Sequence, residues 1–274
     1  MFNNKVIDYL DLSRKQGSFG VEIEMELNNF LDTPAVDELY QSGWNVCNDG
    51  SLRGPSCELV MRTPKSLTET HNMVSDVSHI LNRHDLHITP SIRAGVHIHM
   101  NMQRSTIGEM FKFLLAYYPL ETVLLRQCGF GRQGNLFCLR GRDAEYVFEA
   151  LENAVEGENL YDLRTDSLRY SAMNIQSLFK FGSVEFRALA TTPSLDNITK
   201  WCSIMQKLKD YSSKTATSWD VIGNISGDGP ENYVRNVLGE DLASEFIYDG
   251  MAEDIMKDVR NVQRLAFLLT SKGL

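Results

Sequence analysis

The sequence predicts an α+β protein. Segments in which apolar and polar residues alternate are spread over the first two thirds of the chain, and each is long enough for one strand. The second half is instead dominated by apolar residues at helical spacing. The connections between the predicted strands are too irregular for a doubly wound parallel sheet, in which strands and helices alternate regularly.

In four segments apolar and polar residues alternate, as they do in half-buried strands. In residues 18–28, apolar side chains on one face alternate with glutamates on the other, and in residues 93–102 they alternate with histidines. Residues 56–62 and 182–190 follow the same rule. Pro64 ends the second of these strands because proline cannot donate a ladder hydrogen bond.

Helices are predicted between and after the strands. Residues 68–81 form an amphipathic pattern, and further helices are expected at about 105–127, 143–157, 194–211 and within 230–272. The length of 274 residues allows one or two domains.

Composition and charge narrow the functional classes. Hydrophobic residues make up 43% and charged residues 23%, which is typical of globular proteins, and no apolar run reaches the ~20 residues of a membrane span. The net charge of 27 − 36 = −9 disfavours long nucleic acid as a partner. The 5 cysteines are widely spaced, without a CxxC pair, so we expect neither a disulfide framework nor a structural zinc site, and a cytoplasmic location.

The polar faces of the predicted strands carry mostly ionisable side chains. Neighbours on one face of a strand lie about 6.5–7 Å apart, because the rise is ~3.3 Å per residue. Asp49, in the NDGS turn at 48–51, could join them. If the strands share one sheet, its polar face gathers Glu22, Glu24, Glu58, His97, His99, Glu185 and Arg187.

Two interpretations of this polar face compete. A solvated sheet face also alternates charged with apolar residues, but it usually mixes Lys, Thr, Ser and Glu. Here one strand offers acids only and another histidines only, and two carboxylates ~4 Å apart repel by about 4 kcal/mol at an effective dielectric constant of 20. A divalent cation removes that cost. Carboxylate oxygens suit Mg²⁺ or Mn²⁺, and an imidazole shifts the preference towards Mn²⁺ or Zn²⁺, so we favour a metal site.

Taken in order, these motifs resemble the amidoligase family, which belongs with glutamine synthetase and glutamate–cysteine ligase among the carboxylate–amine ligases. The motifs are GVEIE at 20–24, NDGS at 48–51, ELV at 58–60, GVHIH at 95–99, Asn174, and VEFR at 184–187. The resemblance implies a curved, mainly antiparallel sheet that forms a funnel, with helices on its outer face. It implies a catalytic core over residues 1–192 and a helical region over 193–274, packed on that core in the same domain. Family members are frequent in phage genomes, which fits a viral origin and the host cytoplasm.

The resemblance also implies a role for each motif. ATP would lie at one end of the funnel and the carboxylate substrate at the other, with Mg²⁺ or Mn²⁺ bridging the phosphates. Arg187 would face the transferring phosphoryl group, with Glu185 and Asp49 also in the catalytic set, and Asn174 would help to hold the nucleotide. One of His97 and His99 would meet a metal or a phosphate. The implied metal ligands are Glu22, Glu24, Glu58, His97 and Glu185.

The implied reaction has two steps. ATP phosphorylates a carboxylate, and an amine then displaces phosphate from the acyl phosphate to form an amide. Such chemistry needs positioning and charge neutralisation more than a protein nucleophile. The competing functions are a metal-dependent hydrolase that uses the same acids, and a non-catalytic binding or virion protein. The sequence leaves open the oligomeric state and whether the carboxylate and amine belong to small molecules or peptides.

Three arginine-bearing segments are further candidates for substrate contact. Residues 126–142 carry four arginines and no acid, and form either an exposed loop or a loop over ATP or an acidic substrate. Their GFGRQG string matches GxGxxG but follows a predicted helix, so a dinucleotide site is disfavoured. Arg164 and Arg169 belong either to a lid over the substrate or to an ordinary charged loop. Arg62 is assigned to substrate binding, although ELVMRTP is longer than the ELV-x-P run of many family members.

Overall fold

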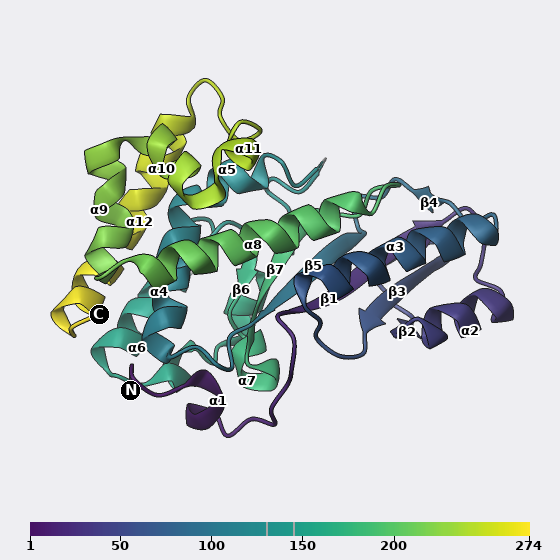
Figure 1. The fold of residues 1–274 in the computed structure, drawn as a ribbon, viewed down its shortest axis with the longest axis horizontal. Coiled ribbons are helices and arrows are strands. Elements are labelled where there is room, and N and C mark those ends of the chain that lie inside the picture. The colour runs from purple at the N-terminus through teal and green to yellow at the C-terminus, as the bar shows by residue number, and fades with distance from the viewer. Residues whose placement is uncertain (130, 145) are drawn as a thin grey trace.

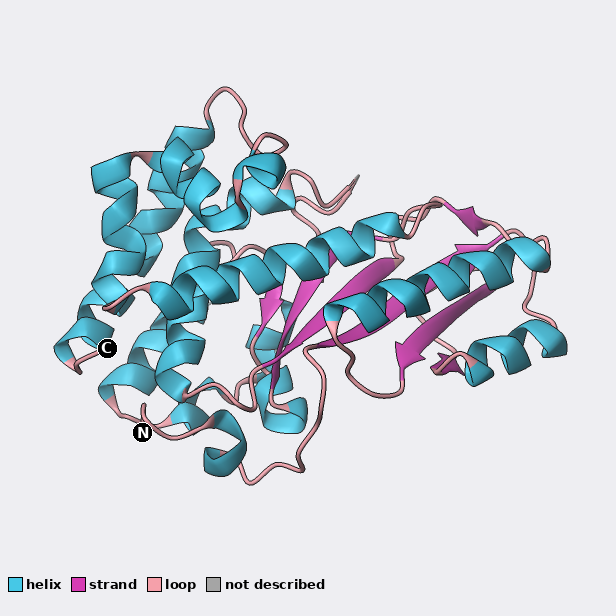
Figure 2. Cartoon of the chain, in the orientation of Figure 1, coloured by secondary structure: helices cyan, strands magenta, loops and turns pink. Residues whose placement is uncertain are grey.

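A computed structural model describes residues 1–129, 131–144 and 146–274 and contains helices around one open antiparallel sheet (Figures 1 and 2). The α+β class is therefore confirmed. Within the described ranges the sheet has seven strands in the order β2-β3-β1-β5-β7-β6, and β4 pairs with β1. Four strands match the predicted segments: β1 (Phe19–Leu27), β3 (Ser56–Met61), β5 (Gly95–Asn101) and β7 (Ser183–Ala190). The others are β2 (Trp44–Cys47), β4 (Ile88–Thr89) and β6 (Met173–Asn174).

One face of the sheet is apolar and lies under two long helices. Buried and half-buried residues alternate along the whole of β1, as the sequence pattern predicts. The helices α3 (Leu67–Arg83) and α8 (Asp196–Lys214) run across this face (Figure 1). The indole of Trp201 in α8 stacks on the ring of Phe186 in β7, with 4.9 Å between the ring centroids. The charged side chains of the alternating strands are thereby left on the opposite face.

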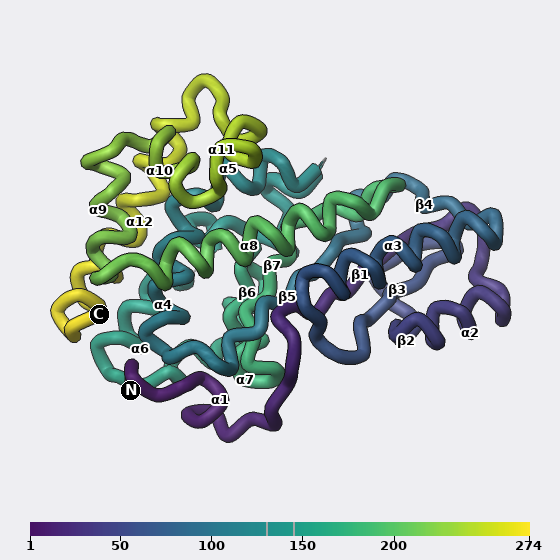
Figure 3. The backbone as a smooth tube through the Cα atoms, viewed as in Figure 1, coloured from purple at the N-terminus to yellow at the C-terminus, as the bar shows by residue number. Residues whose placement is uncertain are grey.

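The remaining helices gather mainly beyond one end of the sheet (Figures 1 and 3). In this region α4 (Ile107–Tyr117) and α5 (Glu121–Leu125) are joined by a 3₁₀ turn over Tyr118–Leu120, where Pro119 interrupts the helix expected at 105–127. Among the described residues, no helix is long and apolar enough to cross a membrane. The other helices here are α6 (Val147–Glu156), α9 (Ser218–Asp228), α10 (Pro230–Leu238), α11 (Glu240–Ala243) and α12 (Met251–Ser271).

Shorter helices lie at the margins of the sheet. They are α1 (Val6–Tyr9), α2 (Thr33–Gln41), α7 (Ser177–Phe181) and the 3₁₀ segments η2 (Leu160–Leu163) and η3 (Asp166–Tyr170). Proline in the first turn of α2 and the side chain of Asp32, which accepts from the amide of Ala35, start that helix.

A buried carboxyl group anchors the end of the arginine-rich segment 126–142. Glu121 of α5 is 2% exposed, and its Oε2 accepts from the Gly141 amide at 2.6 Å. The hydroxyl of Tyr117 donates to Oε1 at 3.1 Å. Asp258 of α12 accepts from the Thr122 amide and from Arg142, at 3.0 and 2.9 Å. Burial raises the pKa of Glu121 to about 8.

The chain enters β1 through a tight backbone contact at Gly17. This residue has φ +86°, and a Cβ atom built on it would lie 2.3 Å from the carbonyl oxygen of Pro64. The Asn101 side chain donates to the Gly17 carbonyl at 2.9 Å, and the amides of Ser18 and Phe19 donate to the Lys65 carbonyl. Glycine is therefore required here both by conformation and by space.

Candidate metal site between two clefts

Strand register brings the predicted polar residues together on the face away from α3 and α8. Glu22 of β1 lies directly opposite His97 of β5, and His99 of β5 lies opposite Glu185 of β7. Asn174 of β6 lies opposite Glu185 and donates to its Oε2 at 2.6 Å. Residues far apart in the sequence therefore meet because their strands are neighbours in one sheet.

A β-bulge lies at the centre of this face. The pairing of β5 with β7 shifts between Val96 and Ile98, whose partners are Leu189 and Phe186. The segment of β7 that holds Arg187 thus has one residue more than the segment of β5 opposite it. Bulges re-aim side chains and leave backbone groups unpaired, and they are frequent beside active sites.

His97 lies among three carboxylates. Its Nδ1 atom is 3.2 Å from Glu22 Oε2 and 3.4 Å from Glu185 Oε1, and its Nε2 is 3.6 Å from Glu24 Oε1. The residue is only 6% exposed. An imidazole nitrogen carries one proton at most, so Nδ1 can only share a single proton between the two carboxylates. The buried cluster therefore holds more negative charge than this histidine alone can balance.

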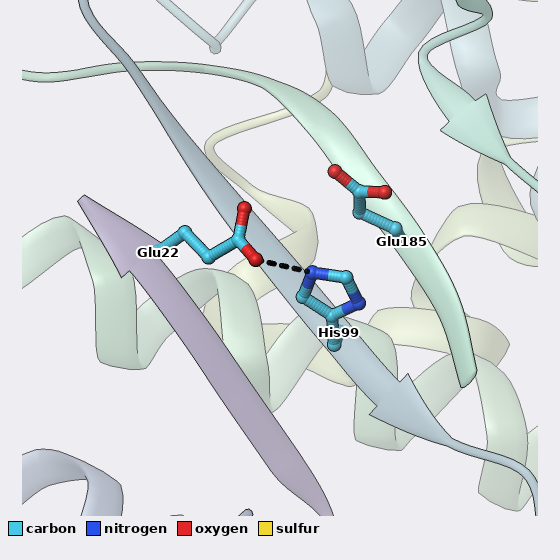
Figure 4. Close-up of side chains that lie close together, drawn as sticks. All are labelled: Glu22, His99 and Glu185. Atoms are coloured by element: carbon cyan, nitrogen blue, oxygen red, sulfur yellow. Dashed lines mark ion pairs between the residues drawn. The ribbon is translucent and has the colours of Figure 1, made fainter. Parts of the chain in front are cut away.

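A set of three ligand atoms could hold a cation beside His97. Glu22, His99 and Glu185 each offer one atom, and these atoms lie within 4.8 Å of one another (Figure 4). His99 Nδ1 is 3.1 Å from the hydroxyl of Ser183, and Nε2 is buried without a hydrogen bond in the described part of the chain, although it lies 3.3 Å from Glu22 Oε1. Two carboxylates suit Mg²⁺ or Mn²⁺, and the imidazole nitrogen favours Mn²⁺ over Mg²⁺.

Opposite charges in this cluster stabilise each other's ionised form. Burial opposes ionisation of Glu22, but its contacts with His97 and His99 hold the pKa of this carboxyl well below its usual range. Burial likewise disfavours the charged form of His99, but Glu22 and Glu185 raise the pKa of the imidazole. The protein thus keeps Glu22 ionised, as a metal ligand must be, whereas His99 must release its proton when a metal binds.

A second acidic group surrounds Glu24. Its Oε2 accepts from the Gly95 amide at 2.9 Å, and burial raises the pKa of the carboxyl. Glu58 of β3 lies directly opposite Glu24. Burial and the charges of Glu22, Glu24 and Asp49 raise the pKa of Glu58 to about 6. Asp49 lies at the edge of this group, where the Ser51 amide and hydroxyl outweigh partial burial and lower the pKa of Asp49.

Two clefts open on opposite sides of the cluster. The apolar cleft, of about 170 Å³, includes Glu22 and His99 in its lining together with Val60, Met61, Phe181 and Lys15. The arginine cleft, of about 560 Å³, includes Glu24, His97 and Asp49 together with Arg53, Arg93, Arg132 and Arg187. The acids and histidines therefore form a partition that both clefts reach.

Arg187 connects the partition to the arginine cleft. One guanidinium nitrogen lies 2.5 Å from Glu185 Oε1, whereas Nε is buried without a hydrogen bond in the part of the chain that the structure describes. Arg132, from the arginine-rich segment, donates to the carbonyl oxygens of Ala188 at 3.0 Å and Arg187 at 2.6 Å. These carbonyl groups lie at the bulge, so Arg132 fixes the strand that carries Arg187.

Comparison with models of known protein families and with curated proteins finds no match. The geometry of the site is therefore the basis for assigning a function.

The predicted site residues divide into two groups in the structure. Glu22, Glu24, Glu58, His97, His99, Asn174, Glu185 and Arg187 lie on the polar face, with Asp49 at its edge. Arg62 borders the apolar cleft, but its guanidinium donates to the Tyr40 carbonyl at 2.7 Å and covers the Tyr40 ring. Arg164 and Arg169 are exposed on the segment around η2 and η3 and line neither cleft.

Most arginines of the arginine-rich segment 126–142 form ion pairs with other parts of the protein. Arg126 pairs with Asp254, Arg140 with Asp143 and Arg142 with Asp258, while Arg132 reaches the site. Phe130 of the GFGRQG string lies outside the described residues. Sequence reasoning therefore found the segment but did not distinguish Arg132, because the bulge that it binds has no sequence signal of its own.

Proposed function

We propose that the protein is an ATP-dependent carboxylate–amine ligase that forms an amide or isopeptide bond through an acyl phosphate. The observation that carries the proposal is the convergence of carboxylates and imidazoles from three neighbouring strands on a partition between two clefts. A reaction with two substrates and a phosphoryl transfer needs such an arrangement, because both reactants must reach the same cationic centre. The ordered motifs that resemble the amidoligases support the same assignment.

The donor set fits a divalent cation. Glu22, His99 and Glu185 would hold Mg²⁺ or Mn²⁺, with His97 and Glu24 beside them. The bound cation would neutralise the phosphate charge during transfer. The second acidic group, Glu24, Glu58 and Asp49, could hold another cation nearer to the arginine cleft.

The clefts differ in the substrate that they suit. The apolar cleft offers Val60, Met61 and Phe181 to a flat nucleotide base and Lys15 to phosphates. The arginine cleft offers cations to a carboxylate. Arg187, held by Glu185 and with a free Nε, would bind the equatorial oxygens of the transferring group between the two clefts.

In the first step, a carboxylate oxygen attacks the γ-phosphorus of ATP, and the bond to ADP breaks. In the second, the amine nitrogen attacks the acyl carbon, phosphate leaves with the C–O electron pair, and the amine proton passes to solvent or phosphate. Acid, amine and ATP thus give amide, ADP and phosphate. The chain contributes binding, orientation and fixed charge to both steps.

The direct test incubates the protein with ATP, Mg²⁺ or Mn²⁺ and pools of carboxylates and amines, and measures ADP together with products that have lost one water. ADP release should require both an acid and an amine. Glu185→Gln should lower the rate on the order of 10²-fold, whereas Glu149→Gln, at an exposed position on α6 that lines neither cleft, should change it little. Cleavage of a pooled compound without ATP would instead identify a metal-dependent hydrolase.

Metal binding is tested separately by thermal unfolding. Mn²⁺ at about 100 times its Kd should add about 2.7 kcal/mol to the free energy of unfolding, which corresponds to roughly 5–10 °C in Tm. His99→Ala should remove most of this shift, and His87→Ala, at an exposed position, should retain it. An equal shift in both variants would show that the cation binds elsewhere.

A further inference from the structure

The lining of the arginine cleft holds more cationic than anionic side chains, with four arginines against Glu24 and Asp49. Arg132 is 4% exposed, and its hydrogen bonds go to backbone carbonyl oxygens. In residues 1–129, 131–144 and 146–274, Arg53, Arg93 and Arg132 have no carboxylate partner within ion-pair distance. A buried cation without a counter-charge is costly, so an anion in this cleft would be bound favourably. This local excess of arginines lies in a chain whose overall net charge is −9.

The two carboxylates that line the cleft form no ion pair with its arginines in the described residues. Glu24 accepts from the Gly95 amide and faces His97, and Asp49 accepts from the Ser51 amide. The arginines extend from the floor of the cleft, at Arg132 and Arg187, to its exposed mouth, at Arg93. A ligand with more than one negative charge would bind arginines at the floor and at the mouth of the cleft together.

The mouth of the cleft is rimmed by exposed apolar side chains. Ile92 and Phe137 line it and are 56% and 64% exposed, and the neighbouring Leu136 is 73% exposed. The ring centroid of Tyr170, on η3, lies 6.4 Å from that of Phe137. Exposed apolar groups around a polar cleft are typical of a surface that binds a larger partner. A free small acid would occupy the cleft and leave this rim in water.

We propose that the acid substrate is an acidic segment of a polypeptide. One of its carboxylates reaches Arg132 and Arg187, a second meets Arg93 at the mouth, and flanking apolar side chains pack on Ile92 and Phe137. This inference rests on the proposed function, and it makes the product an amide or isopeptide bond on a peptide carboxylate. A nucleic-acid strand would also meet the arginines, but its regularly repeated phosphates need a longer basic surface than the four arginines of this cleft provide.

The test measures binding by fluorescence anisotropy without ATP or metal. The probes are labelled hexapeptides with two adjacent glutamates flanked by Leu, Phe, Ala or Ser, and the competitors are their Gln–Gln counterparts, free glutarate and a single-stranded oligonucleotide. The best acidic peptides should have apolar flanks and bind at least 10-fold more tightly than each competitor. Equal binding of glutarate or of the oligonucleotide, or no binding of any acidic peptide, would overturn the proposal.

Surface variants locate the binding site. The double substitution Leu136→Ser with Phe137→Ser should weaken peptide binding about 10-fold, and Arg93→Gln should weaken it severalfold. Phe267→Ser, at an equally exposed position on α12, should leave it unchanged. An unchanged affinity in the Leu136 and Phe137 double variant would show that the rim does not bind the peptide.

The peptide-binding proposal and the ligase proposal can fail independently of each other. If the acidic peptides bind but no acid and amine release ADP, the ligase assignment fails and the peptide site stands. If glutarate and an amine release ADP as efficiently as the best peptide does, the ligase assignment stands and the peptide site fails.

Discussion

At the scale of single residues, Glu121 shows how a carboxyl group outside the site can control stability. It is buried between α5 and the end of the arginine-rich segment, and its folded pKa of about 8 lies above the ordinary value of 4.5. Between these two pH values the folded protein binds more protons than the unfolded chain does. The free energy of unfolding must therefore fall as the pH rises through this window.

We predict that Glu121→Gln flattens the pH dependence of stability between about pH 5 and pH 8. The slope of the free energy of unfolding against pH should differ between parent and variant by up to about 1.4 kcal/mol per pH unit in the middle of this range. The reason is that the variant cannot take up the proton, while the shape of the side chain is kept. Urea unfolding at pH 5, 6.5 and 8 measures it. Glu149→Gln, at an exposed position on α6, is the matched control. If both variants follow the parent's pH profile, Glu121 does not hold the extra proton.

Much of the site could be predicted residue by residue, because side chains on one face of a strand alternate. Glu22, Glu185 and the two histidines were assigned to one polar face from this rule, and the structure places them there. The rule could not decide which imidazole offers a free nitrogen. That depends on the hydroxyl of Ser183 and on the strand register, which are tertiary properties.

At the scale of elements, the entry to β1 depends on Gly17. Its positive φ and its contact with the Pro64 carbonyl hold the segment that precedes β1 against the segment that follows β3. Lys15, at the wall of the apolar cleft, belongs to the same segment. The position of this cleft wall therefore depends on one residue without a side chain.

We predict that Gly17→Ala lowers the free energy of unfolding by roughly 2–4 kcal/mol, through strain at positive φ and collision with backbone. Gly227→Ala in α9 is the control, because its new methyl group meets no atom within 4 Å. Alanine there should raise stability by up to about 1 kcal/mol. The midpoint of urea unfolding is measured for both variants. A midpoint of Gly17→Ala equal within error to that of the parent would contradict the prediction.

Elements with strong periodicity were predictable, and short ones were not. The four alternating strands and α3 appear close to their expected bounds. The strands β2, β4 and β6 have 4, 2 and 2 residues, too few for alternation to be recognised. The helix α2 is not among the predicted elements, although its capping Asp32 and the proline in its first turn are start signals for a helix. Whether the sheet has the funnel curvature of a ligase stays a prediction.

At the scale of the whole molecule, the sheet and the C-terminal helices share one hydrophobic core. Buried residues form a continuous cluster from β1 to α12. Trp201 of α8, which stacks on Phe186, belongs to the region after residue 192. The helix α8 also lies beside α3 over the apolar face of the sheet (Figure 1).

We predict that residues 1–192 do not fold alone, because removing α8 exposes the apolar face of the sheet to water. The fragment should show no cooperative thermal transition by circular dichroism, whereas residues 1–274 should show one. Adding the separately prepared segment 193–274 should restore part of the transition if the two pieces associate. A cooperative transition in the isolated fragment would instead identify an independent domain.

The strand order of the sheet ends in a short strand on each side. The strand β2 has only 4 residues and β6 only 2, while the longest strands lie in the interior of the strand order. A short border presents few free amide and carbonyl groups to another chain. Strand-by-strand addition of further copies is thereby disfavoured, and the long, apolar strands of the interior are kept away from the edges at which fibres start.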